Sequence, residues 1–428
     1  MKHTHRMAVA IGVATIAVGA ALGGGAANAA PSPTASPTHT ATWCRHHPGK
    51  CPTPKPTVKP TPKPTTPTVR KPFRVGWTNQ NQGPSPFPGM TDGFQAAVQY
   101  INKNGGINGR LIEIVPCYTD QTPQMNQQCG NQFANDPSLN LVMLGENGSA
   151  GALFDALKPS ALPILISLPS SAPDFTSTNA VSYAGGSSIV GPSIAAVAKK
   201  EGAKTVSMVG SDSAAARVGI DSAGTELLKQ GIVLNKVVIT LPYTDPLPLI
   251  LQAKASSVDL IANALGTNCL PFLKAQKQLG IPSSKTVTSS NCASAPLIAQ
   301  DPSLYQGAKV YLFSDDALMG KGVSPDLDLF IDNYPKYAAM SQTGGAPAFA
   351  ASGWATVFSL RNALKGKPDS VLDNKASLLT ALRAFKGPAV MGADVLNCGG
   401  YPEWGPALCT DQGVFAQVQG EKYVKYRV

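Results

Sequence analysis

The chain has 428 residues, of which 43% are hydrophobic and 14% charged, so it can build a large core over two or three domains. Its formal charge of +10 is concentrated in the first 72 residues, which carry nine Lys or Arg and no acid, and the remainder is nearly neutral. A nearly neutral folded region argues against nucleic-acid binding. All five histidines precede residue 48, which excludes His-containing catalytic triads and His-ligated zinc from the rest of the chain.

Residues 1–30 have the pattern of a secretory signal peptide. The start MKHTHR is basic, an apolar run follows at residues 7–22, and Ala27-Asn28-Ala29 fits a small-residue cleavage site. A membrane anchor is the alternative, but the run is short and rich in Gly and Ala. A bacterial lipid anchor requires a cysteine at the cleavage site, and the first cysteine of this chain is Cys44, well beyond that site. We therefore expect a secreted protein without a lipid anchor.

Residues 31–72 form a linker rich in Pro, Thr and Lys. Such a segment cannot bury enough surface to fold, and it favours an extended polyproline II spacer. Its lysines Lys55, Lys59 and Lys63 recur at every fourth position. We expect either a contact with an anionic cell-wall polymer or a simple soluble stalk.

Eight cysteines form an even set of close neighbours, and an exported chain permits disulfides. The predicted pairs are Cys44–Cys51, Cys117–Cys129, Cys269–Cys292 and Cys398–Cys409. The segment between the first two cysteines also contains two histidines, so a metal site is the alternative there. Because oxidised thiols do not bind metals, we expect no metal and no cofactor.

Strand-like and helix-like segments alternate from residue 73 onwards. Strands are expected at 73–78, 111–118, 141–145, 162–169, 205–210, 233–241, 259–265, 286–290 and 307–313, with a closing hairpin at 414–418 and 422–428. Helices are expected at 90–104, 124–134, from about 150, and at 190–201, 214–230, 249–256, 270–279, 326–337, 349–365 and 375–385. Repeated βα units predict an α/β fold of parallel sheets with helices on both faces. There are too many strands for one core, so we expect two doubly wound lobes with a ligand cleft at the carboxyl ends of the strands.

The stretch GMTDGFQAAVQYINKNGGINGRLIEI at residues 89–114 resembles type 1 periplasmic binding proteins of the branched-chain amino acid (Leu/Ile/Val) kind, which serve ABC transporters. The similarity continues at residues 141–153, 162–173, 202–214, 256–265 and 272–281. It covers residues 73–315 by sequence and 316–428 by the order of elements.

The resemblance implies a three-segment hinge, with crossings near residues 183–188, 313–316 and 388–397. One lobe would comprise residues 73–185 and 316–388, and the other residues 186–315 and 389–428. It also implies a monomeric, non-enzymatic protein that captures an amino acid or amide-like solute and delivers it to an ABC permease. The chain lacks G-x-S-x-G, S-x-x-K and phosphate-loop motifs, which agrees with a binding role. A secreted sensor or scavenger without a transporter is the alternative.

Members of this family bind the carboxylate of an amino acid at helix N-termini, where free N–H groups and the helix dipole favour an anion. The resemblance places Ser149 and Ala150 after one strand, and Ser170 and Ser171 after the next, as ligand contacts. Ser149 and Ser170 would also suit simple helix caps.

Four further residues complete the predicted site. We expect Phe87 to pack on the ligand or to cover the edge of the lobe. We expect Asp212 to bind an amine or to serve as a turn carboxylate. Asn268 and Asn291 each follow a strand and lie beside a cysteine of the predicted third pair. That disulfide would brace two neighbouring loops of the cleft wall.

The sequence departs from amino-acid binders at two points. Residues 214–217 contain no aromatic side chain after the Asp212-Ser213 corner, and residues 291–293 contain no acid that could pair with an amine. The alternatives for the ligand are therefore an amino acid, an amide, a peptide fragment, an aromatic acid or another small polar molecule.

Overall fold

The computed structural model describes residues 70–83, 86–338 and 349–428. The predicted signal peptide, nearly all of the linker and the pair Cys44–Cys51 lie outside these residues. All the elements described below belong to one unit, Thr68–Val428. No helix in the described part of the chain is long and apolar enough to span a membrane.

The first sheet has five parallel strands in the order β2-β1-β3-β4-β5. These are β1 (Phe73–Gln80), β2 (Ile112–Thr119), β3 (Leu141–Leu144), β4 (Ile164–Ile166) and β5 (Ala180–Ser182). Between them run α1 (Pro88–Lys103), α2 (Pro123–Ala134), α3 (Gly151–Leu157) and α4 (Ala172–Thr176). The sheet is thus built from successive βα units, as the sequence predicts.

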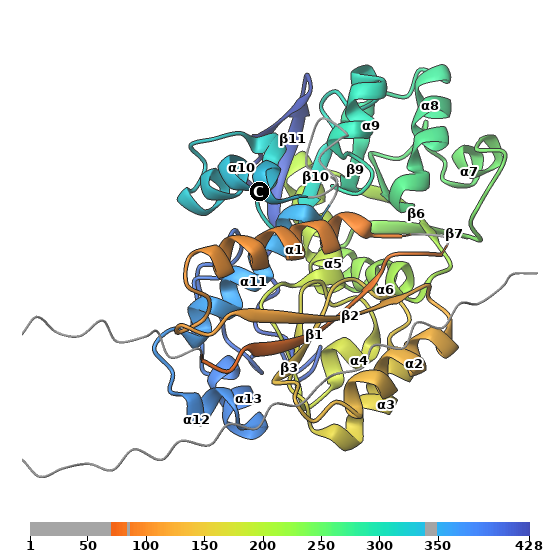
Figure 1. The fold of residues 1–428 in the computed structure, drawn as a ribbon. Helices are drawn as coiled ribbons and strands as arrows, with labels where there is room; N and C mark the ends of the chain where they lie inside the picture. Colours follow the sequence, from red (N-terminus) through yellow and green to blue (C-terminus); the bar gives the residue numbers. More distant parts are fainter. Residues whose placement is uncertain (1–69, 84–85, 339–348) are drawn as a thin grey trace, which may run out of the picture. The chain divides into compact units, whose positions relative to one another are not determined.

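Helices cover both faces of this sheet, with α1 and α11 on one side and α2 and α3 on the other (Figure 1). Successive strand residues point to opposite faces. In β3, Leu141 and Met143 therefore join the core under α1, while Val142 and Leu144 join the core under α2 and α3. This explains why the strand is apolar at every position rather than at every second one.

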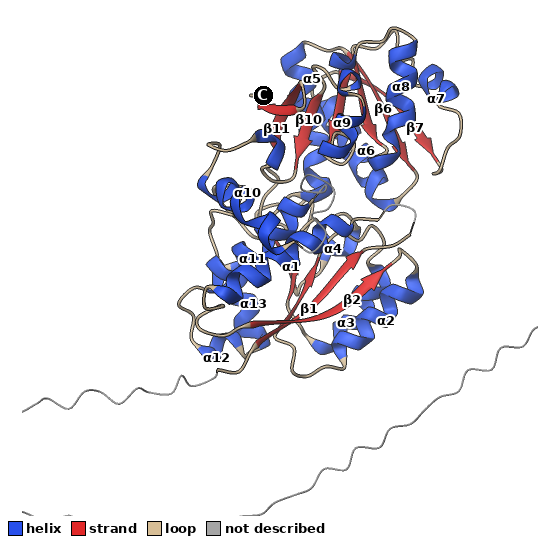
Figure 2. Ribbon diagram, turned by 45° about the horizontal axis from the view of Figure 1, so that its top comes forward, coloured by secondary structure: helices blue, strands red, loops and turns tan. Residues whose placement is uncertain are grey.

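The second sheet has seven strands in the order β12-β11-β10-β9-β8-β6-β7. Its strands are β6 (Thr205–Ser211), β7 (Val233–Ile239), β8 (Leu260–Ala264), β9 (Thr286–Ser289), β10 (Lys309–Leu312), β11 (Val414–Gln419) and β12 (Lys422–Lys425). Its helices are α5 (Val190–Glu201), α6 (Ala214–Lys229), α7 (Leu247–Gln252), α8 (Leu270–Gln278) and α9 (Ala295–Gln300). Strands β6 to β10 are parallel, and β11 and β12 add an antiparallel hairpin at the edge. The prediction of two α/β lobes with parallel sheets is confirmed, and Figure 2 shows the two sheets in separate halves of the folded unit.

Four later helices return to the first lobe: α10 (Pro325–Tyr337), α11 (Ala350–Leu364), α12 (Asp369–Leu372) and α13 (Lys375–Arg383). Helix α11 crosses α1 at very short range through two glycines. A Cβ atom on Gly93 would overlap the carbonyl oxygen of Ala350, and one on Gly353 would overlap that of Met90. Only glycine permits the two backbones to approach this closely.

The chain passes between the two sheets three times. It leaves β5 for α5 through residues 183–189, and it leaves β10 for α10 through residues 313–324. Residues 389–409, which the resemblance assigns to the second lobe, pack against the first core. Leu396 and Cys409 are buried in that core, and Leu408 forms a β-bridge with Ser182. The chain joins the second sheet at Val414.

Three disulfides lie in the described part of the chain: Cys117–Cys129, Cys269–Cys292 and Cys398–Cys409. They are the pairs predicted from close spacing. The first ties β2 to α2, and the second joins the loops that follow β8 and β9.

Candidate functional site

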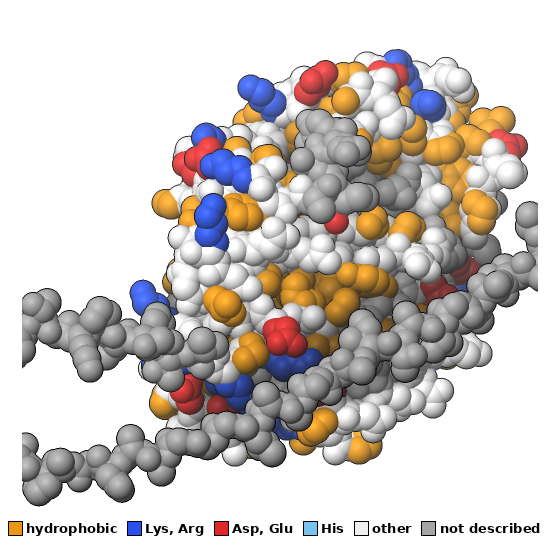
Figure 3. All heavy atoms as spheres, viewed as in Figure 1, with side chains coloured by type: hydrophobic (Ala, Val, Ile, Leu, Met, Phe, Trp, Pro, Cys, Tyr) orange, Lys and Arg blue, Asp and Glu red, His pale blue; other side chains and the backbone are white. Residues whose placement is uncertain are grey.

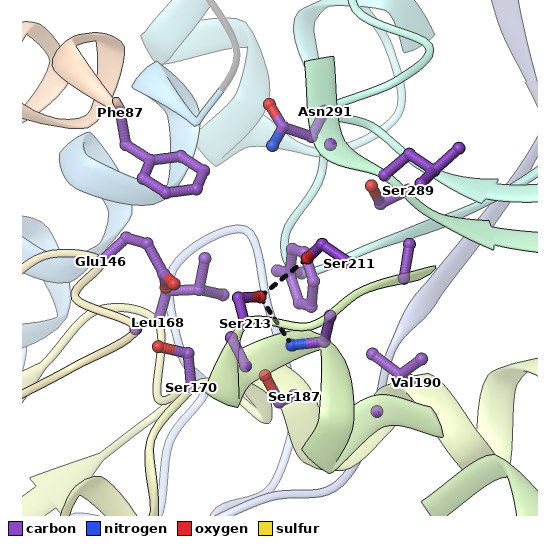
Figure 4. Close-up of a pocket in the computed structure, with 18 of the residues that line it drawn as sticks. Phe87, Glu146, Leu168, Ser170, Ser187, Val190, Ser211, Ser213, Ser289 and Asn291 are labelled. Carbon is purple, nitrogen blue, oxygen red and sulfur yellow. Dashed lines mark hydrogen bonds between the residues drawn. The ribbon is translucent and has the colours of Figure 1, made fainter. Parts of the chain in front are cut away.

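A cavity of about 350 Å³ lies between residues of the two lobes. Its walls come from loops that follow the carboxyl ends of strands in both sheets, where parallel α/β sheets bind their ligands. The first lobe contributes Phe87, Gln121, Glu146, Gly148, Ser149, Leu168, Ser170 and Phe349. The second contributes Ser187, Val190, Ser211, Asp212, Ser213, Ala215, Ala216, Gly219, Leu241, Ala264, Leu265, Gly266, Ser289, Asn291 and Tyr311, and Phe313 lies at the second crossing. Figure 4 shows Phe87, Glu146 and Ser170 facing Ser211, Ser213 and Asn291 across the space.

Asn79, near the end of β1, organises the first-lobe wall. Its side-chain Nδ2 donates to the carbonyl oxygen of Phe87 at 2.8 Å, and its Oδ1 accepts from the backbone nitrogen of Glu146 at 2.8 Å. One buried amide therefore fixes the backbone at two residues of the first-lobe wall, Phe87 and Glu146. Gly145 is required beside it, because a Cβ there would overlap Asn79 Oδ1.

Glu146 is the most unusual residue of this wall. Its side chain is 4% exposed, and its Oε2 is buried without a hydrogen-bond partner among the described residues. Burial raises the pKa of Glu146 to about 8, the nearby Ser170 hydroxyl lowers it in part, and the Asp174 carboxylate raises it further. Glu146 is therefore mostly protonated at neutral pH.

Asp174 occupies the helix N-terminus next to Glu146. Its Oδ2 accepts from the backbone nitrogens of Ser170 at 2.9 Å and Ser171 at 2.8 Å, and from the Ser171 hydroxyl at 3.0 Å. Burial raises the pKa of Asp174 to about 6, while these three hydrogen bonds lower it and favour the ionised form. The N–H groups at this helix start are therefore satisfied by the protein's own carboxylate.

The second-lobe wall is lined mainly by hydroxyl groups and small side chains. Ser211 and Ser213 hydrogen-bond to each other at 2.9 Å, and Ser213 caps α6 by accepting from the Ala216 nitrogen. Asp212 is exposed, and its Oδ2 accepts from the Thr240 hydroxyl at 2.9 Å. Asn291 is buried and lines the cavity at the end of β9.

Aromatic rings form the apolar side of the cavity. The ring of Phe349 lies 5.5 Å from that of Phe87 and 5.9 Å from that of Phe313. The buried Tyr311 ring also lines the cavity and lies 6.0 Å from that of Phe313. Such a cluster offers an apolar body of a ligand a flat and rigid surface.

Five of the eight predicted site residues line the cavity: Phe87, Ser149, Ser170, Asp212 and Asn291. The other three do not line it. Ala150 is fully buried in the core beneath α3, and Ser171 begins α4 and binds Asp174. The Asn268 carbonyl oxygen accepts from the Tyr243 hydroxyl at 2.8 Å.

Several residues that line the cavity were not predicted from the sequence, above all Glu146, Ser211, Ser289 and Phe349. Glu146 carried a usable signal, because it is a lone acid two residues beyond an entirely apolar strand. Phe349 carried none, since it lies more than 170 residues from every other first-lobe contact.

The described residues contain no candidate metal centre, and the face drawn in Figure 3 shows no continuous basic patch. No group of three or more His, Cys, Asp or Glu residues within 70–83, 86–338 and 349–428 could hold a metal ion. Figure 3 shows acidic and basic side chains interspersed on the face in view, with apolar side chains between them.

The chain belongs to the periplasmic binding protein family, whose model matches residues 72–402. No curated protein matches it. Among solved structures it is similar to an ABC transporter substrate-binding protein from Sphaerobacter thermophilus, with 17% identity, coverage of 84% of this chain and 97% of that one, and a TM-score of 0.68. A substrate-binding protein from Desulfitobacterium hafniense, in complex with Leu, has 18% identity, coverage of 83% and 99%, and a TM-score of 0.61. A solute-binding protein from R. palustris, in complex with benzoate, has 15% identity, coverage of 83% and 95%, and a TM-score of 0.67.

Proposed function

We propose that the protein is an extracytoplasmic solute-binding protein that captures a small polar molecule between its two lobes for ABC-type uptake. The observation that carries this proposal is the cavity of about 350 Å³, which both sheets line with the residues that follow their strands. A volume of this size suits a ligand of amino-acid dimensions. The family and the similar transporter components support the same role.

The three connections between the sheets would act as the hinge. Ligand contacts from both lobes stabilise the closed form over the open form, because only the closed form satisfies both sets of contacts. The secretion signal at residues 1–30 and the basic linker at 31–72 would place this binding unit outside the cytoplasm, joined to the cell surface or free. We propose that it acts as a monomer.

The test is a thermal-shift and calorimetry screen of the secreted chain against amino acids, amides, peptides and sugars. A ligand present at about 1,000 times its Kd stabilises the folded state by about 4 kcal/mol, which raises Tm by several degrees. Small-angle scattering with the best ligand should show a smaller radius of gyration. A folded protein that responds to no compound would overturn the proposal, and turnover of a bound compound would show an enzyme instead.

Uptake and sensing are separated by a second experiment. Deletion of the gene should reduce uptake of the radiolabelled ligand by intact cells if the protein serves a permease. Unchanged uptake, with ligand binding intact, would favour a sensor or scavenger.

A further inference from the structure

The inference concerns the chemical class of the ligand, and it rests on the proposed function. The helix start at Ser170 and Ser171 is where the resemblance places the ligand's carboxylate. Both backbone N–H groups already donate to Asp174 Oδ2, at 2.9 and 2.8 Å. The N–H of Ser149, at the neighbouring loop, donates to Asn147 Oδ1 at 3.2 Å. A ligand carboxylate at this wall would have to displace an internal acceptor.

The same wall presents an acid to the cavity. Glu146 Oε2 and Ser170 Oγ are both buried, and both belong to residues that line the cavity. The Ser170 hydroxyl lies close enough to the Glu146 carboxyl to lower its pKa, but neither atom has a well-aligned hydrogen-bond partner among the described residues. Figure 4 shows the two side chains close to each other at the cavity surface. Buried polar atoms of this kind are usually satisfied by a ligand or by water.

The charges around Glu146 are all negative or neutral. Asp174 lies behind it in the same lobe, Asp212 lines the opposite wall, and the buried Tyr311 hydroxyl is the other titratable group in the lining. No Lys, Arg or His occurs among the described residues that line the cavity. An anionic ligand group would therefore meet acids without any compensating cation, which is costly in a desolvated site.

We propose that Glu146 and Ser170 recognise an N–H donor at the polar end of the ligand, an amide or an amine, and that this wall rejects free carboxylates. The carboxyl oxygen of Glu146 accepts from the ligand nitrogen, and the Ser170 hydroxyl donates to or accepts from the same group. The apolar body of the ligand lies against Phe87 and Phe349. The class of ligand is thus a small apolar amide or amine rather than an α-amino acid held by its carboxylate.

The experiment uses two triplets of probes with matched bodies: benzamide, benzylamine and benzoate, and isovaleramide, isoamylamine and isovalerate. Their affinities for the secreted chain are measured by isothermal titration at pH 6, 7 and 8. The variants are Glu146→Gln, which keeps an oxygen acceptor without the charge, and Glu146→Leu, which removes the polar atoms. Glu226→Gln is the matched control, because Glu226 lies on α6 and pairs with Lys229 at the surface.

We expect the amide or the amine to bind at least tenfold more tightly than the acid of the same triplet. Glu146→Leu should weaken that binding about tenfold or more, which is the loss expected for one strong hydrogen bond. An amide should keep its affinity within a few fold in Glu146→Gln, whereas an amine should lose affinity there and should bind the wild type more tightly as pH rises from 6 to 8. Glu226→Gln should match the wild type.

Tighter binding of benzoate or isovalerate than of their amides would overturn the inference, and so would unchanged amide and amine affinities in folded Glu146→Leu. The proposed function survives these outcomes if any compound binds. If the folded protein binds neither these probes nor any member of the wider screen, the proposed function and the inference fail together. Circular dichroism and a melting curve establish that each variant is folded.

Discussion

The Oδ2 atom of Asp174 lies 2.8 Å from the backbone nitrogen of Ser171 and accepts its hydrogen. This contact places a carboxylate of the protein at the helix start where amino-acid binders of the family are expected to hold a carboxylate of the ligand. The arrangement pairs an ionised Asp174 with a mostly protonated Glu146. At neutral pH the two acids therefore carry about one negative charge between them. No basic side chain occurs among the described residues that line the cavity.

Replacing Asp174 with alanine tests this arrangement directly. The change frees the N–H groups of Ser170 and Ser171 and removes a negative charge beside Glu146. We expect the free energy of unfolding to fall by about 1–2 kcal/mol, as for the loss of a helix cap. We also expect the affinity for benzoate to rise relative to that for benzamide. Urea unfolding and titration calorimetry measure the two effects. An unchanged ratio of the two affinities would contradict the idea that Asp174 blocks an anion site.

The stability of the protein should depend on pH through Glu146. Its pKa is raised from the usual 4.5 to about 8 by burial, so the folded state keeps its proton over a range in which the unfolded state has lost it. Stability therefore falls as pH rises from about 4.5 to about 8, with a limiting slope of about 1.4 kcal/mol per pH unit from this group. In Glu146→Gln this contribution is absent. The variant should match the wild type near pH 5 and exceed it at pH 8–9 in urea unfolding.

Asp174 adds a smaller total contribution of the same sign, because it acts over the narrower range between its usual pKa of 3.8 and about 6, in both the wild type and Glu146→Gln. The difference between the two proteins therefore isolates Glu146. Parallel stability curves for the two from pH 5 to 9 would show that Glu146 is ionised throughout in the folded state.

The crossing of α1 and α11 gives a prediction about packing. Gly353→Ala places a methyl group against the backbone carbonyl of Met90, which cannot move without shifting α1. We expect a destabilisation of about 1–3 kcal/mol, typical of overpacking a rigid contact. Gly151→Ala is the control, because α3 begins there and no atom lies within 4 Å of the added Cβ. That variant should be neutral or more stable by about 0.5 kcal/mol in thermal unfolding. Equal effects of the two substitutions would mean that the helices separate freely.

The order of elements could be predicted because the local patterns are strong. The apolar run at Leu141–Leu144 indicates a strand buried on both faces, and the glycines of Gly105–Arg110 indicate a sharp corner. The packing of residues 389–409 against the first lobe could not be predicted from local sequence patterns. It depends on a bridge between Leu408 and Ser182, which are more than 200 residues apart, and local patterns carry no such information.

Residues that line the candidate cavity could be found from the sequence where they follow strands directly. Ser149, Ser170 and Asp212 occur at such positions and line the cavity. Whether a helix start is free to bind an anion could not be predicted, because this depends on which way the Asp174 side chain turns. The position of Glu146 after an apolar strand could have marked it as a candidate, but an acid at such a position is usually a solvated turn residue. Only the fold shows that Glu146 lines the cavity.

The corner at Gly105–Arg110 supports the last prediction. Arg110 is buried, and its guanidinium donates to the carbonyl oxygens of Lys71 and Pro72 at 2.9 and 3.0 Å and to Asp373 Oδ1 at 2.9 Å. One side chain thus joins the start of β1 to α12 and α13, which are distant in sequence.

Lysine at position 110 could satisfy only part of this set, because its single ammonium lacks the planar fork of the guanidinium. We therefore expect Arg110→Lys to lower the free energy of unfolding by about 2–3 kcal/mol, since hydrogen bonds to a buried charge are strong. Arg70→Lys is the control, because Arg70 is exposed and should change stability by less than about 0.5 kcal/mol. Both are measured by urea unfolding at pH 7. Ligand affinity should be unchanged in both variants, since neither residue lines the cavity. A loss in Arg110→Lys no larger than in Arg70→Lys would show that the corner contributes little to holding these segments together.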